Sequence, residues 1–360
     1  MLLFAALTAI LALPPAQAAG TFSLADLERL LAARPTKSME EALPLLPPEF
    51  RRNPVLMAHS RSLQSGSPDA PRAILSNDDG SFVLAFGRGG DSFEMVQFHR
   101  DTRRFEFAEV AFDRKSPAKV EHDLMRCSGC HGNSNDSHPV FESFPKWPGA
   151  YGESGERLEA TVEAPALAAF LKAAKTDSRY GALVDLDRTH GTLDSAGRLA
   201  GRPNSAFVRK MMRLNFERIA DRIVNSPKYE AARYRLLAAY TCTAEATFKD
   251  DFLAGLGNVP SRLLPIDRDA KQYEPEEAIA FYWILPKLGY DPFDWSLAFG
   301  DMYGDQGARL PEPDADYGTS AEELARAFAA SDPRIAALVG RDGRTKPSCA
   351  KLRDLDRASR

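Results

Sequence analysis

The sequence lacks most of the features that would assign a function at once. It contains only four cysteines in 360 residues, and no block of like charge interrupts a chain whose net charge is −4. The absence of basic and acidic blocks argues against nucleic acid and against a strongly charged partner. The chain has no phosphate-binding loop, nucleotide-binding motif or Ser-His-Asp order. Hydrophobic residues make up 44% of the chain and charged residues 27%, which excludes wholesale disorder.

The longest apolar run stands at the N-terminus. Residues 2–13 (LLFAALTAILAL) are followed by two prolines and by Ala16-Gln17-Ala18. This pattern is typical of a signal peptide with an A-x-A cleavage site, so we expect residues 1–18 to be removed. The run is too short to span a bilayer, and no later stretch approaches about 20 apolar residues. The sequence therefore predicts a soluble, exported, periplasmic protein without a membrane span after cleavage.

The N-terminal part of the mature chain shows helical and then β-type patterns. Ser23 to Asp26 form a capping-box-like start for a helix that should run to about Ala33. Residues 72–112 hold four apolar runs separated by Asn-, Asp- and Gly-rich turns, which predicts an antiparallel meander with aromatic residues on its buried face. In residues 93–98 and 105–112 the alternation of apolar and polar residues shifts by one position. Either a β-bulge or burial on both faces explains the slip.

Beyond residue 114 the pattern becomes helical. We expect helices at 119–131, 165–175, 204–225, 228–247, 275–288 and 320–330. The predicted fold class is α+β, with an N-terminal helix and antiparallel β-meander followed by a larger, mainly α-helical part. We therefore divide the chain into a signal peptide (1–18), an N-terminal α/β part (19–113) and a helical part (114–360).

One motif carries specific chemistry. Residues 127–131 read Cys-Ser-Gly-Cys-His, the C-x-x-C-H pattern that attaches c-type haem. On a helix, Cys127 and Cys130 are i and i+3 and share one face, so both thiols can reach the two vinyl groups of the porphyrin. His131 is i+4 from Cys127, and its imidazole emerges where the iron must lie. The sequence predicts one covalently attached haem c, bonded to Cys127 and Cys130 with His131 as the proximal iron ligand, in the helical part.

Three other interpretations of the motif are weaker. A zinc site needs a second pair of ligands, but His138 and His190 are isolated and Cys242 and Cys349 stand far apart in the sequence. A thioredoxin-like dithiol needs a helix after its first cysteine, whereas the loop-like stretch GNSNDSHP follows His131. An inert structural disulfide would leave His131 without a role.

Cys242 and Cys349 remain when haem takes the other two cysteines. In an oxidising compartment, thiols tend to pair, so we expect one disulfide between these two residues. It would close a loop of about 100 residues and hold a charged C-terminal tail that has few apolar residues of its own.

The chain resembles known proteins at two levels. Residues 127–131 resemble the c-type cytochromes. More broadly, residues 138–152 (HPVFESFPKWPGAYG), the β-meander and residues 213–223 (RLNFERIADRI) look like a group of uncharacterised exported mono-haem proteins. The resemblance implies a periplasmic protein with a single haem and brings no assigned activity. In those relatives an Arg-Pro often stands where His138-Pro139 is here, which weakens His138 as an iron ligand.

The sixth position on the iron decides much of the function. A sulfur ligand favours electron transfer, whereas an open position favours ligand binding or peroxide chemistry. The candidate distal ligands are Met212 and Met211 in the predicted helix 204–225, and Met302 in the Gly-flanked loop FGDMYGDQG. Core packing is the alternative role for Met211 and Met212, because methionine commonly fills gaps.

Several other side chains have two interpretations. Trp147 and Tyr151 could pack a haem edge or form a rigid aromatic plug. Arg126 could pair with a haem propionate or lie exposed in solvent. His190 is expected in a turn, and the remaining histidines, at the surface or in strands, are His59, His99 and His122.

The function that these features predict is one-electron transfer by a periplasmic mono-haem c-type cytochrome. The partners would be the cytochrome c maturation machinery and an unidentified periplasmic redox protein. A mature chain of more than 300 residues exceeds what one haem needs. Two alternatives therefore stay open: a haem enzyme or sensor with an open distal site, or a structural or interaction protein that haem staples together.

Overall fold

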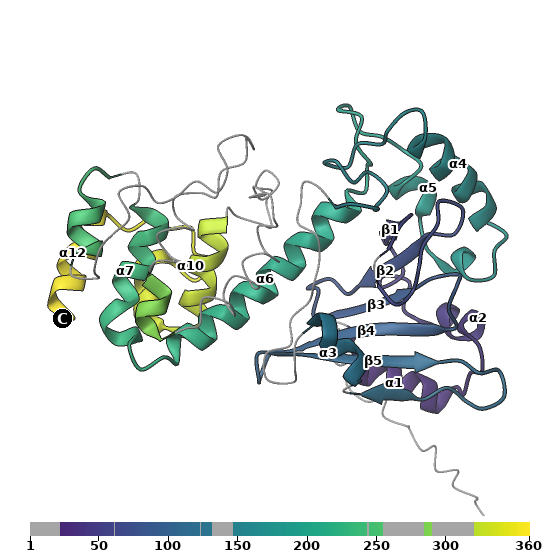
Figure 1. The fold of residues 1–360 in the computed structure, drawn as a ribbon, viewed down its shortest axis with the longest axis horizontal. Helices are drawn as coiled ribbons and strands as arrows, with labels where there is room; N and C mark the ends of the chain where they lie inside the picture. Colours follow the sequence, from purple (N-terminus) through teal and green to yellow (C-terminus); the bar gives the residue numbers. More distant parts are fainter. Residues whose placement is uncertain are drawn as a thin grey trace, which may run out of the picture.

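The computed structural model combines a six-stranded antiparallel sheet with a group of helices, an α+β fold as the sequence predicts. The structure describes residues 22–60, 62–122, 124–131, 147–242, 245–254, 284–289 and 320–360. Figure 1 shows the sheet on one side and helices α7 (Tyr229–Thr241), α10 (Ser320–Ser331) and α12 (Cys349–Ala358) on the other. Helix α6 (Pro203–Val224) runs between the two. The predicted signal peptide lies outside the described residues.

The first helix begins where its capping box predicts. In α1 (Leu24–Ala33), the Asp26 N–H donates to Ser23 Oγ at 3.3 Å, and the Ser23 N–H donates to Asp26 Oδ2 at 2.9 Å. These reciprocal bonds satisfy two N–H groups that the helix itself cannot pair. Leu27 and Leu31, one turn apart, are buried against the sheet side of the molecule. The predicted helix is confirmed.

The sheet is a meander in which every strand pairs with the next along the chain. Its strands are β1 (Val55–Met57), β2 (Arg72–Ser76), β3 (Phe82–Phe86), β4 (Ser92–His99), β5 (Arg104–Ala111) and β6 (Val120–His122). The four apolar runs predicted between residues 72 and 112 form the four central strands.

The slipped alternation in β4 and β5 is not a bulge. Their pairing runs without interruption from Ser92 opposite Ala111 to His99 opposite Arg104. Phe93 belongs to the same hydrophobic core as α1, whereas Phe107 belongs to the core that includes α6. Burial on both faces therefore explains why apolar residues occupy positions of both phases.

Each face of the sheet has its own core. One core lies against α1, α2 (Met39–Ala42) and α4 (Glu163–Ala174). The other contains residues of α6 and continues through α7, α10 and α11 (Pro333–Val339). The remaining short elements are the 3-10 turns η1 (Leu43–Leu45), η2 (Tyr180–Ala182) and η4 (Leu285–Leu288), helix α5 (Leu186–Thr189) and the π-helical turn η3 (Lys249–Leu253).

Three of the predicted helices are found close to their expected bounds, as α4, α6 and α10, and the helix expected at 228–247 is found as α7 but ends six residues earlier, at Thr241. The helix expected at 119–131 is wrong over its first turn, because residues 120–122 pair with β5 as edge strand β6. Helix α3 (Met125–His131) begins only afterwards. Most of the helix expected at 275–288 lies outside the described residues. The proposed boundary at residue 113 stays a prediction.

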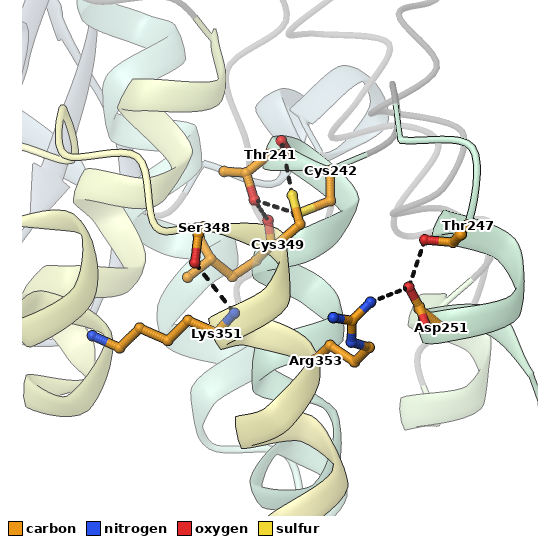
Figure 2. Close-up of a disulfide and its surroundings, with 9 residues drawn as sticks. Thr241, Cys242, Thr247, Asp251, Ser348, Cys349, Lys351 and Arg353 are labelled. Atoms are coloured by element: carbon orange, nitrogen blue, oxygen red, sulfur yellow. Dashed lines mark hydrogen bonds and ion pairs between the residues drawn. A yellow bond between two sulfur atoms is a disulfide. The ribbon is translucent and has the colours of Figure 1, made fainter.

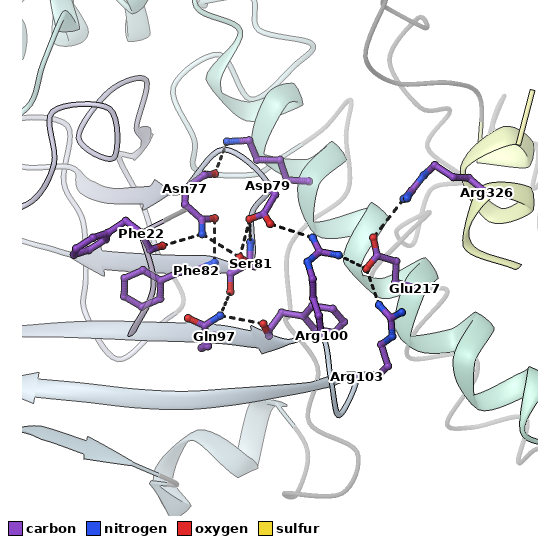
Figure 3. A network of polar contacts seen from close by, with 12 residues as sticks. Phe22, Asn77, Asp79, Ser81, Phe82, Gln97, Arg100, Arg103, Glu217 and Arg326 are labelled. Carbon is purple, nitrogen blue, oxygen red and sulfur yellow. Dashed lines mark hydrogen bonds and ion pairs between the residues drawn. The ribbon is translucent and has the colours of Figure 1, made fainter. Parts of the chain in front are cut away.

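A buried acid joins the sheet to α6. Glu217 of α6 forms ion pairs with Arg103 at 3.0 Å, with Arg326 of α10 at 3.6 Å and with Arg100. Arg100 and Arg103 stand at the turn between β4 and β5, and Arg100 also reaches Asp79 at 3.1 Å (Figure 3). Because the Glu217 side chain is only 6% exposed, losing its arginines would leave a buried charge without compensation.

Helix α6 also begins at a buried acid. Glu156, 1% exposed, accepts a hydrogen bond from the Ser205 N–H at 2.7 Å through Oε1. Among the described residues, neither its Oε2 nor the buried Oδ1 of Asn204 has a hydrogen-bond partner. Burial raises the pKa of Glu156 to about 7. The carboxyl group therefore holds its proton more firmly in the folded protein than in the unfolded chain.

We predict that Glu156→Gln stabilises the protein above neutral pH. Between about pH 4.5 and 7 the folded state keeps a proton that the unfolded state has released, so wild-type stability falls as pH rises through that window. At pH 8 the glutamine variant should be more stable by about 2–3 kcal/mol, and the difference should shrink towards pH 5. Denaturant unfolding at both pH values measures this. Glu121→Gln, at an exposed site on β6, is the control, and parallel pH profiles for wild type and Glu156→Gln would contradict the prediction.

The C-terminal helix is held by a disulfide and by a buried ion pair. Cys242, at the end of α7, and Cys349, at the start of α12, form a disulfide with Cα atoms 5.7 Å apart (Figure 2). Arg235 of α7 pairs with the fully buried Asp356 at 2.9 Å, and Leu352 is also fully buried. The tail was expected to depend on the disulfide alone, but it is a helix with packing contacts of its own.

Non-reducing peptide mapping should find one crosslinked pair of peptides, containing Cys242 and Cys349. Replacing both residues by alanine should lower the free energy of unfolding by up to about 4–5 kcal/mol, because the bond joins residues separated by 107 positions and so restricts the unfolded chain. Two alkylatable thiols at these positions in the exported protein would contradict the assignment.

Candidate functional site

The C-x-x-C-H motif lies on one short helix at the sheet. Helix α3 continues through His131, so Cys127, Cys130 and His131 occupy positions i, i+3 and i+4 of one helical segment. This is the backbone geometry that the motif requires if two thiols and an imidazole are to face the same group. The side chain of Cys130 lies outside what the structure describes. Figure 1 shows α3 in front of β4 and β5.

An ion pair fixes the first turn of α3 to the sheet. The Arg126 guanidinium contacts the Glu109 carboxylate of β5. The Glu109 side chain is 16% exposed, so the pair is partly shielded from water, and it is stronger than an exposed pair would be. Arg126 is exposed, as one of its two expected roles has it, and it also ties α3 to β5 through Glu109; a contact with a propionate stays a prediction.

An aromatic stack fixes the last residue of α3. The His131 ring lies on the Phe107 ring of β5, with centroids 4.2 Å apart and planes 27° from parallel. Stacking uses the face of the imidazole, whereas a bond to iron uses a lone pair in the ring plane. The contact with Phe107 is therefore compatible with a metal bond from His131.

Cys127 borders the large core that includes α6. Its half-buried side chain packs against a cluster that contains Phe107, Met211 and Met212. A flat apolar cofactor such as a porphyrin needs walls of this kind. The donor set of two thiols and one imidazole is also the set that a c-type haem uses. The residues present thus fit the group that the motif predicts.

The structure describes two of the three candidate distal ligands. Met211 is 2% exposed, and its methyl group lies against Gly80 in the turn between β2 and β3, so it packs that turn. Met212 is 4% exposed and lies in the cluster that Cys127 borders. Met302 lies outside the described residues. Whether any of them binds iron stays a prediction.

The aromatic residues after the motif are packed inside the protein. Trp147 is 4% exposed and stacks on Phe207 of α6 at 5.7 Å between centroids. The Tyr151 hydroxyl donates to the Pro68 carbonyl at 2.6 Å. Of the two roles predicted for Trp147 and Tyr151, these contacts favour packing inside the protein as a rigid aromatic plug. His138 lies outside the described residues.

The other described histidines stand outside α3. His99 Nε2 is 2.6 Å from Glu106 Oε2, and His122, whose pKa is raised by its hydrogen bond to Glu106, also reaches Glu28 at 2.8 Å. Both stand in strands, as expected, and His59 is exposed. His190 caps α5 and is buried, which lowers its pKa to about 4 and keeps the ring neutral.

Sequence reasoning missed the two β5 residues that hold α3. Phe107 and Glu109 are two positions apart and so point to the same side of the sheet. The stretch FEFAEVAF contains that alternation, but nothing in it says which helix would cover the side shared by Phe107 and Glu109. Their partners, His131 and Arg126, follow much later in the chain.

The described residues contain neither a cluster of metal-binding side chains nor a helix that could span a membrane. No group of three or more His, Cys, Asp or Glu side chains in those residues could hold a metal ion. Within the same part of the chain, no helix is long and apolar enough to cross a membrane. Comparison of the chain with protein-family models, curated proteins and solved structures gave no match.

Proposed function

We propose that this protein is a periplasmic mono-haem c-type cytochrome that transfers single electrons. Cys127 and Cys130 would hold the haem through thioether bonds, and His131 would be the proximal ligand of the iron. The observation that carries the proposal is the continuity of α3 from before Cys127 to His131, which supports the spacing that the motif needs. Bound haem would supply an iron that changes oxidation state by one electron.

The residues around α3 would act on the haem indirectly. Arg126 and Glu109 hold the first turn of the helix, and Phe107 limits rotation of the His131 ring. The apolar cluster beside Cys127 would keep water away from the iron. A drier, less polar site raises the cost of the extra charge on ferric haem and so favours a high reduction potential.

Met212 is the distal ligand that we favour. Both methionines are buried in the cluster that Cys127 borders, but the Met211 methyl group already packs against Gly80. A methionine sulfur on the iron would leave no open position and would suit electron transfer.

A haem enzyme or sensor with an open distal site is the second candidate. The observation that favours it is the amount of structure beyond α3, with a core on each face of the sheet. One haem needs only a small helical wrapper, so the surplus could shape a substrate or docking site. The remaining alternative, a structural or interaction protein stapled by haem, would use the haem only to hold the fold.

Export to an oxidising compartment would explain both roles of cysteine in this chain, haem attachment and the disulfide. The predicted signal peptide would send the chain to an oxidising compartment, and the disulfide between Cys242 and Cys349 is consistent with one. Covalent attachment would need the cytochrome c maturation machinery, and electron transfer would need a redox partner in the same compartment.

Haem should stay with the polypeptide after denaturation, because thioether bonds remain closed when the fold opens. We expect the double variant Cys127→Ala, Cys130→Ala to lose haem staining on a denaturing gel and to lose its pyridine haemochrome spectrum. The matched control is Cys242→Ala, Cys349→Ala, which removes the same number of cysteines and should keep the haem. Extraction of the haem from intact protein into acidified organic solvent would exclude covalent attachment.

The ferrous protein should show sharp low-spin α and β bands that carbon monoxide leaves unchanged, because two protein ligands would fill both axial positions. His131→Ala should give little stable holoprotein, whereas His59→Ala, at an exposed site, should give the wild-type spectrum. Bands that shift with carbon monoxide would favour the open-site alternative. A normal low-spin spectrum in His131→Ala would mean that another residue is the proximal ligand.

A further inference from the structure

Strand β5 contacts α3 at both ends. Glu109 pairs with Arg126 in the first turn, and Phe107 stacks on His131, the last residue of the helix. A helix of seven residues is too short to be stable by itself, so tertiary contacts must hold its conformation. Two contacts at opposite ends also prevent α3 from turning about its own axis.

Phe107 is itself held firmly. It is 8% exposed and pairs with Val96 of β4 in the middle of an uninterrupted ladder. Its ring belongs to the core that includes α6, so it has little freedom to rotate. The half-buried His131 ring thus lies nearly parallel to a rigid aromatic surface, at 4.2 Å between centroids.

We propose that Phe107 is a positioning residue for the iron ligand: its ring sets the plane of the His131 imidazole and so fixes how that plane is oriented relative to the haem. The inference rests on the proposed function, because it gives His131 the role of an iron ligand. Neighbours of a ligating histidine commonly fix its orientation, although they usually do so with a hydrogen bond to the second ring nitrogen. Here the Phe107 ring lies on the face of the imidazole.

The orientation of the imidazole has a measurable electronic consequence. The plane of an axial imidazole determines which iron d orbital holds the unpaired electron of ferric haem. That orbital in turn distributes the unpaired spin unequally over the four methyl groups of the porphyrin. The paramagnetically shifted proton resonances of these methyl groups therefore report the ligand plane, which simple core packing would not alter.

Phe105 provides a matched control. It lies two residues before Phe107 on the same side of β5, it is 4% exposed, and it belongs to the same core. Its ring packs on Phe98 at 4.8 Å between centroids instead of on His131. Substituting leucine at either position removes the same ring from the same core, and among the described ring pairs the one on His131 belongs to residue 107.

The experiment compares wild type, Phe107→Leu, Phe107→Tyr and Phe105→Leu as matured holoproteins. Covalent haem content is measured first, and proton NMR of the ferric haem methyl groups second. We expect Phe107→Leu to change the spread and order of the four methyl resonances. Phe107→Tyr, which keeps the ring, should restore the wild-type pattern, and Phe105→Leu should leave it unchanged.

Each outcome bears on one of the two claims. A wild-type protein without covalent haem would overturn the proposed function, and the role of Phe107 with it. Haem-loaded variants in which Phe107→Leu matches wild type, or in which Phe105→Leu shifts the methyl resonances as much, would overturn the role of Phe107 alone. If Phe107→Leu yields too little holoprotein, Phe107→Met, which fills a similar volume with a flexible chain, is measured in its place with the same expected change.

Discussion

Burial of the sheet on both faces is the constraint on which the rest of this structure depends. Successive residues of a strand point to opposite sides, so a slip of one position between β4 and β5 would exchange the contents of two different cores. If β4 slipped, Phe93 would leave the core beside α1 for the core that includes α6; if β5 slipped, Phe107 would move the opposite way. The ladder from Ser92 to His99 is therefore fixed, and with it the side on which Phe107 and Glu109 receive α3. The geometry of the haem motif follows from the register of two strands.

Helix α6 extends this constraint to the C-terminal helices. Its Glu217 forms ion pairs with arginines of the β4–β5 turn and of α10. A buried carboxylate with several cationic partners tolerates little displacement, because moving it would leave a buried charge unpaired. The same helix supplies Phe207 beneath Trp147 and carries Met212 into the cluster beside Cys127. The core that Cys127 borders thus comes from segments far apart in the chain, and one charged joint holds α6 to the sheet and to α10.

What the sequence could predict was set by how local each interaction is. The capping box of α1 needs four consecutive residues, and the C-x-x-C-H motif needs five, so both could be identified directly. The pairing of Cys242 with Cys349 followed from counting cysteines. By contrast, residues 120–122 form a strand only because β5 offers an edge, and α12 is held by one buried leucine and by Asp356 opposite Arg235. The strand is not visible in hydrophobic periodicity, and the pattern of α12 does not say what it packs on, because in both cases the partner lies elsewhere in the sequence.

The same distinction separates the identity of the cofactor from its properties. Five consecutive residues suffice to predict that haem is attached and which imidazole would approach the iron, and they would do so on many folds. The plane of that imidazole, the dryness of the site and the residue opposite His131 depend on β5 and α6, which only the folded protein brings to α3. A protein that uses its haem for a particular potential or ligand therefore needs more than the motif and a minimal wrapper. If the proposed haem is attached, the large scaffold around α3 would serve to tune it, because a sheet packed on both faces can hold a ligand ring more rigidly than a short helix can by itself.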